Sequence, residues 1–182
     1  MNPILRTATL AALSILLLSG CSIFQSASQR AMCPAVNVLA NTASLTAFKN
    51  GMENDPSAEL YKVEVTGVRL SCSFDKDEGT TDSDIEISLR ASRAPNGDTS
   101  NHTVPYYVVS VLNGATILDK HIYAATFSFQ PGEATTQFTA EVPSMIVHLA
   151  NGKKPYEYGI LVGLQLTREQ LDYSKAHGPL GP

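Results

Sequence analysis

The chain of 182 residues contains no tryptophan, only three cysteines and only 13 lysine and arginine residues against 17 aspartate and glutamate residues. With a formal net charge of −4 it lacks the basic surface that binding to nucleic acid requires. An apolar share of 43%, with 12 glycines and 10 prolines, excludes collagen-like, coiled-coil and wholly disordered chains. The length suits a single folded domain.

The apolar residues are concentrated at the start of the chain. Residues 1–20 begin with a positive amino terminus and Arg6, and continue as an almost unbroken apolar run from Ala8 to Leu18. As a helix this run spans about 17 Å, well short of the bilayer core of about 30 Å. The pattern predicts a signal peptide over residues 1–20 that takes no part in the fold.

The end of this leader, Leu18-Ser19-Gly20-Cys21, resembles the lipobox of bacterial lipoproteins. The resemblance implies that Cys21 is lipidated and becomes the first residue of the mature protein. More than one acyl chain, at about 0.8 kcal/mol per buried CH₂, makes such an anchor stable. Ser22, in place of aspartate, favours the outer membrane, with the domain facing the periplasm. Residues 21–32 are then a lipid anchor and tether.

Once Cys21 carries lipid, Cys33 and Cys72 remain as an even pair in an exported chain. The simplest assignment is one disulfide between them. A metal site and a redox-active thiol are the alternatives, but the chain has no C-x-x-C motif and no histidine close to either cysteine in sequence.

Beyond residue 33 the dominant pattern is an alternation of apolar and polar residues, which is typical of strands with one buried face. Gly67 separates two phases of this alternation and predicts a β-bulge. Asn113-Gly114 predicts a tight hairpin turn. We expect seven strands, over residues 35–39, 60–74, 83–93, 104–112, 115–129, 136–142 and 156–166.

These strands predict an all-β protein, an antiparallel two-sheet sandwich of immunoglobulin or fibronectin-III type over residues 33–177. A lipocalin-like barrel is the alternative, although its eight strands are difficult to find. Thr167 and Gln170 form a capping-box pattern, so we expect a short helix over residues 168–176. Residues 178–182 form a tail rich in glycine and proline.

Several blocks of the mature chain form a recognisable set: Cys33-Pro34, Val63-Glu64-Val65-Thr66-Gly67, Cys72-Ser73-Phe74, Pro105-Tyr106-Tyr107-Val108, Ile117-Leu118-Asp119-Lys120 and Tyr158 to Thr167 followed by Glu169-Gln170-Leu171. Together they resemble a family of uncharacterised envelope lipoproteins of alphaproteobacteria. The resemblance implies an envelope location, one domain, and two recurring cysteines that fit the proposed bridge. It carries no functional site.

The sequence has no G-x-S-x-G motif, and its four histidines lack the H-x-H and H-E-x-x-H spacings. The strongest candidate for a site is the acidic segment of residues 75–84, whose oxygens could bind calcium through Asp75, Asp77, Asp82 and Asp84. The EF-hand template fails because glycine falls one position early, and a solvated hairpin loop is the simpler interpretation.

Two weaker candidates are polar or aromatic side chains on the predicted strands. His121 alternates with Asp119 and Tyr123 and could form the polar side of a groove. Four tyrosines could line a ligand surface if they are neighbours, although core packing is the simpler role: Tyr106, Tyr107, Tyr156 and Tyr158.

The sequence therefore predicts a non-catalytic lipoprotein that acts as a binding or envelope-assembly module, with the membrane and another envelope protein as partners and no cofactor. The alternatives are an envelope enzyme whose site is assembled from scattered residues, and a lipoprotein that binds calcium or a small ligand.

Overall fold

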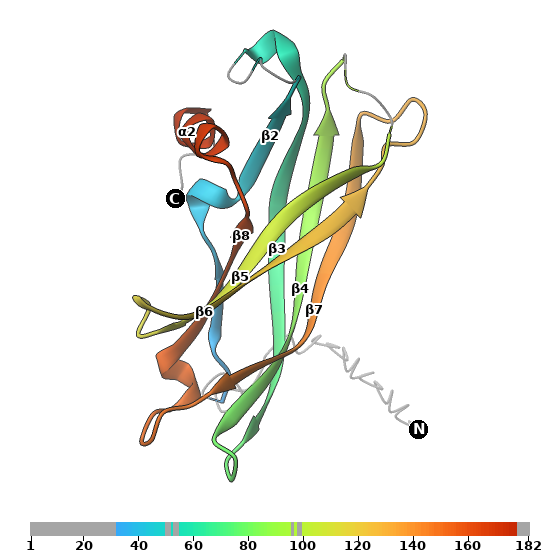
Figure 1. Cartoon of the computed structure of the whole chain (residues 1–182). Helices are drawn as coiled ribbons and strands as arrows, with labels where there is room; N and C mark the ends of the chain where they lie inside the picture. Colours follow the sequence, from blue (N-terminus) through green and yellow to red (C-terminus); the bar gives the residue numbers. More distant parts are fainter. Residues whose placement is uncertain (1–31, 50–51, 53–54, 96, 98–99, 178–182) are drawn as a thin grey trace, which may run out of the picture.

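The computed structural model describes residues 32–49, 52, 55–95, 97 and 100–177 as a sandwich of two four-stranded sheets (Figure 1). Sheet A has the order β1-β8-β5-β6 and sheet B the order β2-β3-β4-β7. The strands are β1 (Ala35–Val38), β2 (Ser44–Phe48), β3 (Glu59–Asp75), β4 (Thr80–Arg93), β5 (His102–Leu112), β6 (Thr116–Phe127), β7 (Thr135–His148) and β8 (Tyr158–Leu164). The predicted two-sheet sandwich is confirmed, and the barrel alternative is wrong.

Several predictions fall outside the described residues: the signal peptide, lipidated Cys21, the tether up to residue 31, and the tail from residue 178. None of the helices in the described ranges is both long enough and apolar enough to span a bilayer.

Two long hairpins supply the centre of the fold, β3–β4 in sheet B and β5–β6 in sheet A. In Figure 1, β5 and β6 cross obliquely in front of β3 and β4. The β5–β6 turn has Asn113 at φ 53° and Gly114 at φ 71°, the left-handed backbone that this pair of residues tolerates best. The register of β3 against β4 shifts between Val65 and Gly67. Both the predicted hairpin turn and the predicted bulge are confirmed.

The main hydrophobic core lies between the two sheets. Strand β5, an inner strand of sheet A, contributes side chains to this core and to a second cluster. Val104, Tyr106 and Val108 of β5 belong to the inter-sheet cluster, whereas Tyr107 and Val109 belong to a separate cluster on the opposite face. The strand is therefore buried on both faces, which explains its nearly continuous apolar sequence.

The described residues form eight strands, one more than expected, because β2, which was not predicted, completes sheet B. Its buried residues include Ser44 and Thr46, two polar side chains that interrupt the apolar pattern. The helix α2 (Arg168–His177) lies beside β2 (Figure 1). Ser44 Oγ is 3.4 Å from Ser174 Oγ, so both hydroxyls are satisfied where helix and strand meet.

The predicted helix start is confirmed. The backbone N–H of Gln170 donates to Thr167 Oγ1 at 3.2 Å, and the backbone N–H of Thr167 donates to Gln170 Oε1 at 2.9 Å. These reciprocal bonds are the two halves of a capping box.

Three predicted strand features are wrong in detail. β8 begins at Tyr158 because Pro155–Glu157 form a 3₁₀ turn, which leaves Tyr156 outside the strand. β7 continues to His148 through an irregularity at Ser144, whose φ is 55°. The pairing of β1 with β8 is parallel, so sheet A is mixed rather than wholly antiparallel.

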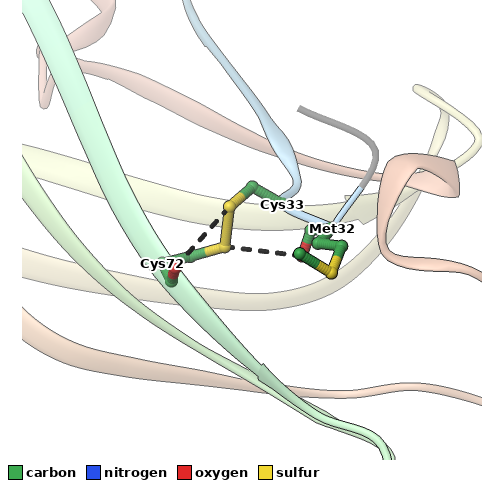
Figure 2. Close-up of a disulfide and its surroundings, with 3 residues drawn as sticks. All are labelled: Met32, Cys33 and Cys72. Atoms are coloured by element: carbon green, nitrogen blue, oxygen red, sulfur yellow. Dashed lines mark hydrogen bonds between the residues drawn. A yellow bond between two sulfur atoms is a disulfide. The ribbon is translucent and has the colours of Figure 1, made fainter. Parts of the chain in front are cut away.

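The disulfide between Cys33 and Cys72 joins the two sheets (Figure 2). Cys33 lies just before β1 of sheet A, Cys72 lies on β3 of sheet B, and their Cα atoms are 5.8 Å apart. The predicted bridge is confirmed. Because 39 positions separate the cysteines, the bond restricts a large part of the unfolded chain.

We predict that the double variant Cys33→Ser/Cys72→Ser loses about 4 kcal/mol of unfolding free energy, the chain-entropy value for a loop of about 40 residues. Denaturant unfolding of the variant and the oxidised parent measures this difference. Mass spectrometry should show the parent gaining two hydrogens on reduction. An unchanged unfolding midpoint would contradict a stabilising role for the bridge.

Candidate functional site

The edge strand β6 carries a group of exposed apolar side chains. Within the described part of the chain, β6 pairs with β5 alone. Ile117 is 67% exposed, Leu118 is 45% exposed and Ile122 is 60% exposed. All residues from 116 to 122 are exposed to solvent. Single exposed apolar residues are common on proteins, but a group on one unpaired strand is typical of an interaction surface.

The register with β5 places most of these side chains on the outer face of sheet A. Ile117 lies opposite Val111, and Ile122 lies opposite Tyr107. Leu118 is the extra residue where the register shifts between Ser110 and Val111. We call the exposed group, together with the outer cluster beneath it, the β6 edge surface: Ile117, Leu118, Ile122, Tyr107, Val109, Val111 and Leu161.

Tyr107 fixes the centre of the β6 edge surface. It lies opposite Gly163 of β8, and its hydroxyl is 2.7 Å from Thr42 Oγ1. A Cβ atom on Gly163 would come within 2.7 Å of the Tyr107 ring carbon Cζ. Burial raises the pKa of the Tyr107 hydroxyl, against a smaller opposite effect of the Thr42 hydrogen bond. The hydroxyl is therefore neutral and acts only as a hydrogen-bonding group.

Lys120 is directed back over the sheet instead of outward from the edge. Its Nζ lies 4.8 Å from the centroid of the Tyr107 ring and donates to Gln165 Oε1 at 2.9 Å. Lysines on edge strands usually discourage further strand pairing. Because this ammonium group is held over the Tyr107 ring, it covers the face of sheet A. It therefore does less to prevent a further strand from pairing with the free edge of β6.

Asp119 and His121 form a polar pair on β6. Asp119 Oδ2 lies 2.7 Å from His121 Nε2, and Asp119 Oδ1 accepts a hydrogen bond from the backbone N–H of Lys120 at 2.7 Å. Tyr123, the next residue in this alternation, stacks on Tyr106 with the ring centroids 5.4 Å apart. The ring centroids of His121 and Tyr123 are 6.2 Å apart. The three predicted side chains are therefore neighbours, on the face of β6 opposite to Ile117 and Ile122.

The acidic segment is divided between a turn and a strand. Asp75 Oδ1 accepts hydrogen bonds from the backbone N–H groups of Asp77 and Glu78, which close the β3–β4 turn. Asp82 and Asp84 lie on β4 and accept from the hydroxyl and the backbone N–H of Ser144. These carboxylates thus hold the irregularity in β7. Within the described ranges, no three metal-ligating side chains are placed to hold an ion.

The four tyrosines do not form one surface. Tyr106 and Tyr107 point to opposite faces of β5. Tyr158 is buried, and its hydroxyl accepts the backbone N–H of Ala150 at 2.7 Å. Tyr156 is exposed beside the disulfide end of the sandwich.

The remaining histidines are dispersed over the fold. The His102 ring packs against Tyr61 and Phe127, and His148 ends β7. His177 ends α2, where its Nδ1 is 3.2 Å from the carbonyl oxygen of Tyr173. The structure does not bring these rings together with His121.

The β6 edge surface was not predicted from the sequence. The pair Ile117-Leu118 directly after a hairpin turn was a signal, because two adjacent apolar residues cannot both point into one core face. Comparison of the chain with protein-family models, curated proteins and solved structures gives no match.

We predict that Gly163→Ala lowers the free energy of unfolding by about 1–3 kcal/mol, because the added methyl group displaces the hydrogen-bonded pair of Thr42 and Tyr107. Gly67→Ala is the matched control, since its nearest neighbouring atoms are 3.9 Å away. Denaturant unfolding of both variants measures the difference. Equal stability of the two variants would show that Thr42 and Tyr107 are not held against Gly163.

Proposed function

We propose that the protein is an outer-membrane-anchored periplasmic lipoprotein whose sandwich acts as a non-catalytic binding or assembly module. Its β6 edge surface pairs with an extended segment of another envelope protein. The observation that carries this proposal is the group of exposed apolar residues Ile117, Leu118 and Ile122 on a strand with which no described strand other than β5 pairs.

Strand addition suits this surface physically. A partner strand gains backbone hydrogen bonds along the edge, while alternate side chains contact pockets and give specificity. On β6 the added strand would meet Ile117 and Ile122 on the outer face of sheet A and the Asp119–His121 pair on the inner face. An uncovered edge of this kind favours aggregation, so a permanent partner also protects the protein.

The proposed anchor places the module near its partners. Lipidated Cys21 lies 11 positions before Met32, where the described structure begins. A flexible tether of this length spans about 18–20 Å. The domain is therefore expected to work close to the membrane surface.

We predict that Ile122→Asp abolishes the cross-linked complex recovered with the tagged protein from envelopes, because a carboxylate on the edge opposes an apolar partner strand. Ile146→Asp is the matched control: Ile146 is 56% exposed and lies on β7, the edge strand of the other sheet. Quantitative mass spectrometry of the recovered complexes compares them. Identical partner recovery from the two variants would refute a role for β6.

We predict separately that Cys21→Ser abolishes labelling by radioactive palmitate and moves the protein from the membrane to the soluble fraction. The serine hydroxyl cannot replace the thiol that receives the lipid. Fractionation of cells that express either form tests this. A serine variant that stays in the membrane fraction would show that the lipobox assignment is wrong.

A further inference from the structure

The sandwich has a half-open cavity at its disulfide end. The cavity has a volume of about 510 Å³ and lies between the start of β1 and the end of β3. Its apolar lining comes from Val36, Leu70, Phe74 and the disulfide, with Met32 and Tyr156 also in contact with it. Figure 2 shows Met32 next to the bridge.

The lining determines the chemical class of ligand. No Asp, Glu, Lys, Arg or His side chain is among the described residues that line the cavity. Ser71 and Ser73 also line the cavity, but their hydroxyls are uncharged. A charged group entering it would lose hydration without gaining an oppositely charged partner, which is unfavourable. The volume lies within the range of about 300–1,000 Å³ that is typical of small-molecule sites. An uncharged, apolar chain is therefore the fitting occupant.

Two large side chains remain exposed around this cavity. Met32 is 47% exposed and Tyr156 is 61% exposed. Tyr156 is outside β8 because Pro155–Glu157 form a separate 3₁₀ turn, and this position brings it to the cavity. A bound apolar chain would cover part of both side chains and gain burial free energy from them.

The position of the cavity in the chain identifies the source of such a ligand. Met32 follows the proposed tether, so the cavity is at the end of the domain that the lipid anchor holds near the bilayer. We infer that this cavity binds the acyl chain of a membrane lipid. This inference rests on the proposed membrane anchor, but it does not depend on the β6 edge surface.

The test uses the chain from residue 21 to residue 182 with Cys21→Ser, purified without detergent, and cis-parinaric acid, a fluorescent 18-carbon fatty acid, as the probe. The chain has no tryptophan, so Tyr156→Trp supplies one reporter beside the cavity. We expect saturable binding at one site, with energy transfer that quenches the tryptophan emission. Probe binding without any quenching would overturn the proposed location.

The matched pair for this test consists of two methionines of nearly equal exposure. Met32→Asp should weaken probe binding by at least about tenfold, because it brings a carboxylate to an apolar cavity. Met52→Asp should bind as the parent does, since Met52 is 45% exposed and lies in the β2–β3 connection, at the opposite end of β3 from Cys72. Equal affinities of the two variants would overturn the inference.

Two further experiments distinguish a membrane lipid from a free fatty acid as the ligand, and the cavity from β6 as the binding site. Phosphatidylethanolamine vesicles that carry a parinaroyl phospholipid should transfer this lipid to the protein, whereas binding of the free fatty acid alone would overturn the assignment to a membrane lipid. Ile122→Asp should leave probe binding unchanged. If Ile122→Asp alone loses the probe, the apolar ligand binds at β6 and the cavity assignment is wrong, whatever the outcome of the partner experiment.

Discussion

Both sheets of this domain are open, so the described residues include four edge strands with unpaired backbone groups, and three of these edges are protected in different ways. β1 has only four residues. β2 is covered by α2, through Ser44 and Ser174. β7 is distorted at Ser144, where carboxylates of β4 hold it. β6 is different, because it exposes the apolar side chains of Ile117, Leu118 and Ile122. This difference is the physical basis of the proposed function.

The elements that could be predicted from the sequence are those whose defining contacts are made by residues close together in the chain. The β3–β4 and β5–β6 hairpins are set by alternation and by the Asn113-Gly114 turn, and the start of α2 is set by the Thr167–Gln170 capping box. These features depend on residues a few positions apart. These elements could therefore be predicted without information about the tertiary fold.

The features that sequence could not predict depend on contacts between distant segments. β2 was missed because its buried Ser44 gains a hydrogen-bonding partner only when Ser174 of α2, 130 positions later in the chain, packs against it. From the sequence, Asp82 and Asp84 resembled calcium ligands. In the structure both carboxylates accept hydrogen bonds from Ser144 of β7. The β6 edge surface was hidden for the same reason, since the sheet order decides which strand lies at an edge.

The most direct test of strand addition is amide hydrogen exchange of β6 in two settings, the purified protein and the native envelope complex solubilised in mild detergent. If a partner strand pairs with β6, the backbone amides of residues 116–122 that face the free edge should exchange much more slowly in the complex, while those of β7 keep their rates. Equal exchange rates in β6 in both settings would contradict the account.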